Sequence, residues 1–395
     1  MTLFEEIKQQ EAELIQIRRD LHRIPEVGML EKKTTRYIKD ALQDCAVEIH
    51  DIGVETGLYV LIRGEYPGRT IALRADIDGL PMKEESGLPF ASEHPEACHA
   101  CGHDLHTAVA IFAVRYLSAH KEKLHGNVWV YFQPAEETLW GAKKIIEAGC
   151  LELDPKPESI LALHTCTPLQ WGKFGFLKGA SNAGCNNLRI TVRSSGGHGA
   201  CPQRCGDPVL ASAMLLAQLQ TCVSRDNDSM LPAVLTFGSI HGGTAPNIIP
   251  AEVVMEGTLR TQYPESLDVI KKSILRISEH ACAAMRTECD VEFLQPSVPC
   301  LHNDSEVVDR AERSARKLFG DEAVCRMELA STGSEDFANY LQYIPGALIR
   351  LGTRNPEDPQ TMLGQHAAAV RFDERSLCYG AAFLCQYVQD YLCEK

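Results

Sequence analysis

Three short apolar stretches of this chain each lead directly into side chains that can bind metal ions. Residues 70–76, in which apolar residues alternate, are followed by Ile77 and Asp78, which give the sequence Asp76-Ile77-Asp78. Residues 128–132 are followed by Gln-Pro-Ala and then Glu136-Glu137, and residues 160–163 precede His164. Apolar runs of this length are typical of strands covered on both faces. Ligands of open α/β sheets bind beyond the carboxyl ends of the strands. The sequence therefore predicts an α/β fold with metal-competent groups at one sheet edge.

The segments around these runs support the same fold class. Thr2 and Glu5 fit a capping box, and apolar residues at helical spacing follow until Pro25, which ends the predicted helix. Strand-like runs then alternate with helical stretches, including a further apolar run at residues 347–351. This alternation predicts an α/β domain with a mostly parallel sheet.

The middle of the chain has a different pattern. Strands are predicted at residues 188–192, 233–240, 251–261 and 291–293, with helices at 208–223 and 267–285. The resulting β-α-β-β-α-β order is that of a ferredoxin-like unit. We expect this unit, residues 184–296, to be inserted between two parts of the α/β domain, residues 1–183 and 297–395.

Charge and composition exclude several classes of protein. The formal net charge of −14 argues against a sequence-wide basic surface for nucleic acid or anionic membranes. The first residues lack the apolar core of a signal peptide, and no apolar run approaches the roughly 18 residues that span a bilayer. The 16 cysteines are therefore expected to be thiols, and the protein to be cytoplasmic.

The densest candidate site is the nine-residue loop from Cys98 to His106. It holds six groups that bind zinc and similar ions: Cys98, His99, Cys101, His103, Asp104 and His106. The alternative is a reactive or merely cysteine-rich loop. The Asp-x-Asp pair upstream, and the Glu-Glu pair and His164 downstream, favour a metal site.

The other candidates each have an ordinary structural explanation. Paired glutamates usually lie on a solvated helix face, but Glu136 and Glu137 follow a buried strand and Pro134. One carboxylate of such a pair could bind metal while the other takes a proton from a metal-bound water. His164 and His366 taken singly are more often incidental, and the glycines around His198 also fit a flexible hairpin.

Taken in order, these segments resemble a known family. They are RDLHRIPE at residues 19–26, ALRADIDGLP at 72–81, HACGHD at 99–104, FQPAEE at 132–137, GGH at 196–198, TAPNIIP at 244–250, EGTLR at 256–260 and GSEDF at 333–337. Together they resemble the metallo-aminoacylase and carboxypeptidase family of amidohydrolases. The similarity is to the branch of bacterial N-acyl-amino-acid amidohydrolases, hippurate hydrolases and plant auxin-amino-acid conjugate hydrolases.

The resemblance implies a zinc-peptidase-like catalytic domain and an inserted lid and dimerisation domain. It implies two divalent metal ions per subunit, zinc first and manganese, cobalt or nickel as alternatives. Cys101 would be the ligand that both ions share, and the remaining ligands would be His103, Glu137, His164 and His366.

The resemblance also implies the catalytic roles. Glu136 would be the general base, and Asp78 would orient a ligand histidine. His198 would stabilise the oxyanion, in the active site of the partner subunit of a homodimer. Asn247 and Arg260 would contact substrate or the other subunit. The expected substrate is a small N-acyl amino acid, whose amide bond is hydrolysed.

Two segments depart from the family pattern, and two other functions stay open. Residues 364–372 lack the proline that often follows the last ligand histidine, and Cys98 is an additional cysteine that we interpret as a bystander. A metallo-dipeptidase or carboxypeptidase would use the same metals, because it also cleaves an amide next to a free carboxylate. A metal-binding protein that has lost catalysis is the alternative from a different class.

Overall fold

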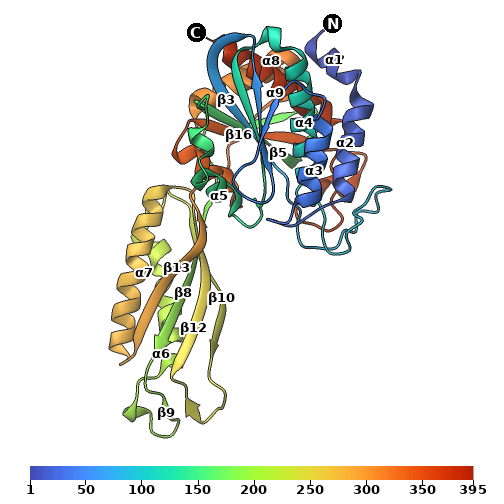
Figure 1. The fold of residues 1–395 in the computed structure, drawn as a ribbon. Coiled ribbons are helices and arrows are strands. Elements are labelled where there is room, and N and C mark those ends of the chain that lie inside the picture. Colours follow the sequence, from blue (N-terminus) through green and yellow to red (C-terminus); the bar gives the residue numbers. More distant parts are fainter. Residues whose placement is uncertain (395) are drawn as a thin grey trace. The chain divides into compact units, whose positions relative to one another are not determined.

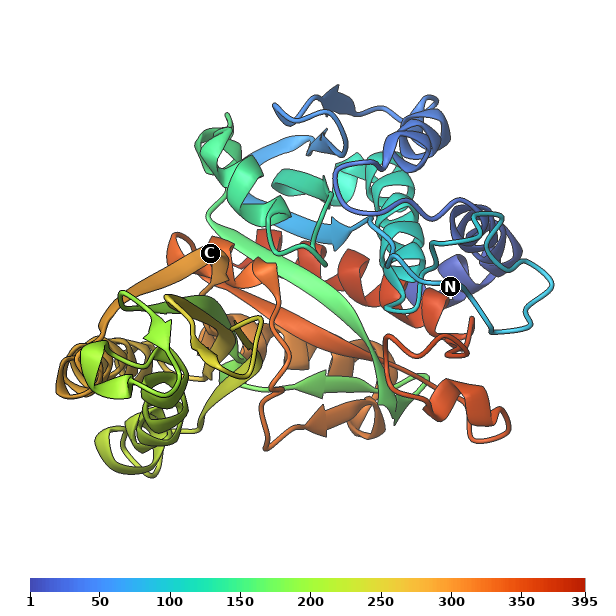
Figure 2. The same ribbon diagram turned by 90° about the horizontal axis from the view of Figure 1, so that it is seen from below.

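The apolar runs of the sequence form the middle of an eight-stranded sheet in the computed structural model, which describes residues 1–394 (Figure 1). Its strand order is β1 (Glu48–His50), β2 (Leu58–Arg63), β4 (His125–Gln133), β3 (Tyr66–Asp76), β5 (Ser159–Gln170), β16 (Gly346–Arg354), β6 (Phe174–Phe176) and β15 (Val324–Arg326). The central strands β4, β3, β5 and β16 are mutually parallel. Figure 2 shows β5 in green beside β16 in orange-red.

The chain forms two compact units, and the larger one comprises Met1–Gly179, His302–Leu329 and the residues from Asp336 onward. Two long helices fill its core because they are apolar on nearly every face. Nearly all side chains of α4 (His103–Ala119) and α9 (Ser376–Cys393) are buried. They pack against each other and against β3 and β4. The other helices are α1 (Leu3–Lys8), α2 (Glu11–Arg23), α3 (Lys32–Leu42), α5 (Gly141–Glu147) and α8 (Ser305–Phe319).

The N-terminal helix differs from the prediction. The capping box of Thr2 and Glu5 is present, but the single expected helix is split into α1 and α2 at Gln9 and Gln10. The break leaves Ile7 and Leu14, one on each side of it, fully buried. Apolar spacing alone did not reveal the break, because both helices direct their apolar residues into the same core.

The smaller unit comprises Ala180–Leu301 and Ala330–Glu335. Its elements are β8 (Gly184–Arg193), α6 (Pro208–Leu219), β10 (Ala233–Gly242), β12 (Glu252–Thr261), α7 (Pro264–Ala284) and β13 (Glu288–Val298). The strands form an antiparallel sheet in the order β10-β12-β8-β13, which is ferredoxin-like, and α6 and α7 pack on it (Figure 1). Strands β9 (Gly197–His198) and β11 (Ile248–Ile249) form a separate pair, and β7 (Gly179–Asn182) and β14 (Leu301–Asn303) lie where the chain passes between units.

The structure corrects several boundaries. Residues 180–183, 297–301 and 330–335, all expected in the α/β domain, group with the smaller unit. Ala183 N there donates to Ser331 O at 3.0 Å. The helix predicted to reach residue 223 ends at Leu219 and is followed by a π-turn at Cys222–Asp226. Among the described residues, no helix has the length and apolar character to cross a membrane.

Candidate metal centre

Neighbouring strands deliver the candidate site residues to one edge of the large sheet. Asp76 ends β3, the Glu136-Glu137 pair follows β4, and His164 lies within β5, which continues to Gln170 rather than ending at the histidine as expected. His103 begins α4 after Gly102, whose φ is +89° and where a Cβ would lie 2.7 Å from Thr165 Cγ2. Glycine is required there because the loop must turn sharply against β5.

The predicted ligands lie in two groups that share one residue. The ligand atoms of Cys101, His103 and His164 lie within 4.8 Å of one another, and so do those of Cys101, Glu137 and His366. Cys101 Sγ is 3.7 Å from His164 Nε2, and His366 Nε2 is 3.3 Å from Glu137 Oε1. Ligands of one tetrahedral zinc ion are about 3.4–3.6 Å apart. The two groups therefore have the spacing of two neighbouring metal sites that share a thiolate.

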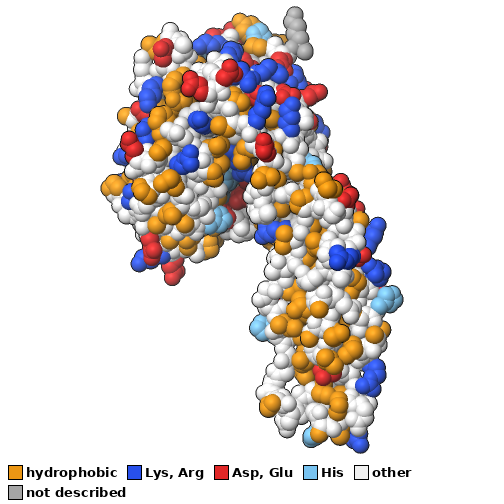
Figure 3. Space-filling view, turned by 180° about the vertical axis from the view of Figure 1, so that it is seen from behind, with side chains coloured by type: hydrophobic (Ala, Val, Ile, Leu, Met, Phe, Trp, Pro, Cys, Tyr) orange, Lys and Arg blue, Asp and Glu red, His pale blue; other side chains and the backbone are white. Residues whose placement is uncertain are grey.

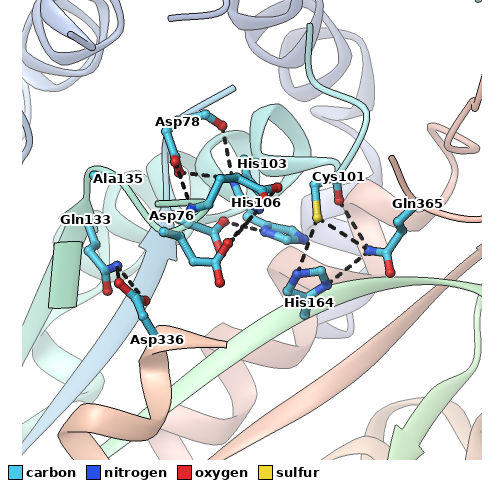
Figure 4. A network of polar contacts seen from close by, with 12 residues as sticks. Asp76, Asp78, Cys101, His103, His106, Gln133, Ala135, His164, Asp336 and Gln365 are labelled. Carbon is cyan, nitrogen blue, oxygen red and sulfur yellow. Dashed lines mark hydrogen bonds and ion pairs between the residues drawn. The ribbon is translucent and has the colours of Figure 1, made fainter. Parts of the chain in front are cut away.

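His103 provides an independent test of whether the residues fit a metal ion. Its Nδ1 lies 2.9 Å from Asp78 O and 3.2 Å from Asp78 Oδ1, so Nδ1 carries the proton and donates it (Figure 4). Nε2 is buried without a hydrogen-bond partner among the described residues. A buried ring nitrogen without a hydrogen-bond partner is costly, and a metal ion bound at Nε2 in place of a proton would satisfy it.

Without metal, the site holds protons that an ion would displace. Burial raises the pKa of the Cys101 thiol. Hydrogen bonds with Cys101, which has the larger effect, and with Glu137 raise the pKa of His366 to about 10. Metal ions bind thiolate and neutral imidazole, so binding to this site releases protons and weakens as the pH falls.

Glu136 lies beside the two groups that contain Cys101 and belongs to neither of them. Its side chain is only 6% exposed, and Oε2 lies 4.0 Å from His103 Nε2. Glu136 forms a third group with His103 and Glu137. Glu137 also belongs to the group of Cys101 and His366. The adjacent glutamates thus occupy different positions, as separate base and ligand roles require.

Residues 72–390 match the model of the peptidase family M20/M25/M40, a range that includes every candidate ligand. This chain belongs to that family. The match confirms the resemblance that the sequence motifs indicated.

Relatives and solved structures extend the similarity over the full length. The N-acetyl-L-cysteine deacetylase of Bacillus subtilis is 35% identical, and the alignment covers 95% of this chain and 87% of that protein. The N-acetyldiaminopimelate deacetylase of Halalkalibacterium halodurans is 37% identical, with 96% and 99% covered. The crystal structure of a dinuclear metal-binding peptidase of the M20 family from Bacillus subtilis matches with a TM-score of 0.85 at 31% identity, with 98% and 99% covered.

Sequence analysis assigned no role to a buried network beside the predicted metal ligands of this family member. His106 accepts a hydrogen bond from Thr165 N at its Nε2 (2.8 Å), so its protonated Nδ1 donates to Asp76 (Figure 4). Burial raises the pKa of Asp76, but His103, His106 and Arg74 hold it well below its usual range. The signal available in the sequence was the Asp-x-Asp pair together with a histidine one helical turn after His103.

A second charged cluster holds the loop of residues 98–106, which we call the metal loop, through Asp104. Asp104, next to the predicted ligand His103, accepts from Arg18 Nε at 2.7 Å and from His22 Nδ1 at 2.8 Å. The other ring nitrogen of His22 lies 3.1 Å from Glu84 Oε1, so both nitrogens face carboxylates and His22 is an imidazolium. Burial lowers the pKa of His22, but Asp104 and Glu84 outweigh it and leave the pKa raised.

Replacing His22 with glutamine will therefore lower stability in a pH-dependent way. Because the folded-state pKa is raised, the contribution of His22 is fully present below its unfolded pKa near 6.5 and is lost as the pH rises through the folded value. The melting temperature of the variant should fall several degrees below that of the wild type at pH 6. The difference should shrink as the pH rises through the raised folded-state pKa of His22, whereas the exposed His94→Gln control should show no such trend. A constant difference at every pH would contradict the assignment.

The remaining predicted residues lie in the smaller unit. His198 in β9 is exposed, and Gly199 N next to it donates to Asn247 O at 2.9 Å, so the structure brings His198 and Asn247 together. Arg260 lies at the opposite end of β12 from this pair and donates to Ser334 Oγ at 2.8 Å. Their roles in oxyanion stabilisation and substrate contact stay predictions.

Proposed function

We propose that the protein is a dinuclear metal-dependent amidohydrolase that releases the amino acid from an N-acyl amino acid. The observation that carries the proposal is Cys101, which belongs to two ligand groups while Glu136 lies beside them. The names of the two deacetylase relatives support acyl substrates over peptides. The two ions are expected to be zinc by ligand softness, with manganese, cobalt or nickel as alternatives.

The residues of the chain divide the chemistry between them. When bound, the metal ions would lower the pKa of a water molecule and polarise the amide carbonyl. Glu136 takes the proton of the attacking water and delivers it to the departing nitrogen. Asp78 keeps His103 in the tautomer that presents Nε2 to the metal.

The smaller unit would act as lid and dimerisation domain. We propose a homodimer in which His198 reaches the active site of the partner subunit and stabilises the oxyanion. Hydrophobic side chains spread over the visible face of this unit in Figure 3, and Val209, Leu210 and Met214 of α6 are about half exposed. Exposed apolar surface of this kind supports a subunit contact. The 16 free cysteines agree with a cytoplasmic location.

The test is the release of free amino acid from a panel of substrates by metal-reconstituted protein. The panel holds N-acetyl-, N-benzoyl- and longer N-acyl-amino acids beside dipeptides. We expect turnover of acyl substrates that EDTA abolishes and added zinc or manganese restores. Turnover of dipeptides alone would establish the peptidase alternative. No turnover of any substrate in the panel, with metal bound, would favour a protein that has lost catalysis.

A further inference from the structure

Glu136 lies on a tight turn whose backbone conformation is unfavourable for the residues that form it. Ala135 has φ +56° and Leu139 has φ +61°, both in the left-handed region although neither is glycine. Leu139 N donates to Glu136 O at 2.7 Å, and Gly141 N donates to Ala135 O at 3.1 Å. Strained residues of this kind persist only when the surrounding structure holds them.

One holding group is a carboxylate far away in sequence. Glu31, just before α3, is fully buried, and its Oε1 accepts from Ala135 N at 2.9 Å and from Met29 N at 3.0 Å. Its Oε2 accepts from Thr56 Oγ1 at 2.7 Å. All three donors point at the carboxylate, and one of them is the backbone amide of Ala135, the residue before Glu136.

The amide that follows Glu136 is held in the same manner. Glu137 N donates to Asp78 Oδ2 at 3.0 Å, and Asp78 is also the residue that orients His103. The backbone amides of the residues on either side of Glu136 thus donate to two buried carboxylates, Ala135 N to Glu31 and Glu137 N to Asp78.

Stability alone does not account for Glu31. Burial and the neighbouring Asp78 raise the pKa of its carboxyl group to about 7, which means that the ionised form is unfavourable at this position. A buried charge is often replaced by an apolar side chain of similar volume without loss of stability. An apolar side chain could not accept these three hydrogen bonds, and it would leave the Ala135 amide without an acceptor.

We propose that Glu31 is a positioning residue for the general base: it holds the left-handed turn at Ala135 and thereby directs the Glu136 carboxylate toward the metal ligands. The inference rests on the proposed role of Glu136. It assigns to Glu31 no contact with substrate or metal.

Two variants of similar volume separate this role from a merely structural one. Glu31→Met removes the acceptor, whereas Glu31→Gln keeps an oxygen for Ala135 and Met29 and turns its amide toward the Thr56 hydroxyl, which can accept. We expect kcat of Glu31→Met to fall roughly 10- to 100-fold with KM and metal content little changed, because small displacements of a reacting group have effects of this size. Glu31→Gln should stay within about threefold of the wild type.

A second readout is independent of activity. Hydrogen exchange of the Ala135 amide, measured on a peptide that spans residues 133–139, should accelerate in Glu31→Met and stay slow in Glu31→Gln. Glu26→Gln is the control, since Glu26 Oε2 accepts from Lys33 N and Thr34 N at the start of α3 and from the Thr34 hydroxyl rather than from the turn. That variant should change neither kcat nor the exchange rate of the Ala135 amide.

The outcomes distinguish this inference from the proposed function. An active wild type with unchanged kcat and unchanged exchange in Glu31→Met would overturn the positioning role. So would equal losses of kcat in Glu31→Met and Glu26→Gln. If the wild type hydrolyses no substrate of the panel, the proposed function fails, while the exchange measurement still decides whether Glu31 holds the turn. If Glu31→Met does not fold, Glu31→Asp, which withdraws the acceptor by one methylene, takes its place.

Discussion

Replacing Glu136 with glutamine will lower kcat for amide hydrolysis by about 10³-fold and leave the metal content of the protein unchanged. Glutamine has the shape of glutamate but cannot take a proton from the attacking water. Metal is retained because neither of the two groups that share Cys101 contains Glu136. The measurements are steady-state kinetics on the best acyl substrate and metal analysis of the purified variant.

The neighbouring glutamate is the matched control. Glu137 belongs to the group of Cys101 and His366, and its Oε1 lies 3.8 Å from His103 Nε2. Glu137→Gln should therefore lose bound metal together with activity, and added metal should partly restore the activity. Loss of metal in Glu136→Gln, or turnover at the wild-type rate, would remove Glu136 from the proposed role.

Replacing Asp336 with alanine will destabilise the larger unit by about 3–5 kcal/mol, because it removes one partner of a buried ion pair. Asp336 is fully buried and accepts from Arg74 Nη2 at 2.9 Å, from Gln133 Nε2 at 2.8 Å and from Ala142 N at 2.8 Å. All three donors lose their acceptor in the variant. In calorimetry, a melting temperature lower by roughly 6–10 °C corresponds to a loss of this size.

The control for Asp336 is an ion pair of the same charge type at the surface. Asp309 lies 2.6 Å from Lys178 Nζ, and both side chains are nearly half exposed. Asp309→Ala should change stability by less than about 1 kcal/mol. If Asp336→Ala melts within a degree or two of the wild type, the network around Arg74 does not stabilise the sheet edge.

The sequence by itself was sufficient for the class of fold and for most of the residues of the candidate site. Apolar alternation is a local property, so it marked β3, β4, β5 and β16 and the β-α-β-β-α-β order of the smaller unit before any contact was known. The site residues were visible because loop 98–106 concentrates groups that bind metals and because polar pairs follow strands of one parallel sheet.

Only the tertiary structure decided which of these groups face one another. The Glu31 carboxylate meets the Ala135 amide across 104 positions of sequence, and Arg74 meets Asp336 across 262. It also showed that His366 N donates to Ala100 O, which places a C-terminal histidine at the metal loop. Such contacts have no local periodicity, because they arise from the packing of elements that the chain order separates. The sequence by itself thus determined which chemical groups are present and on which elements, and packing determined which carboxylate accepts from which donor.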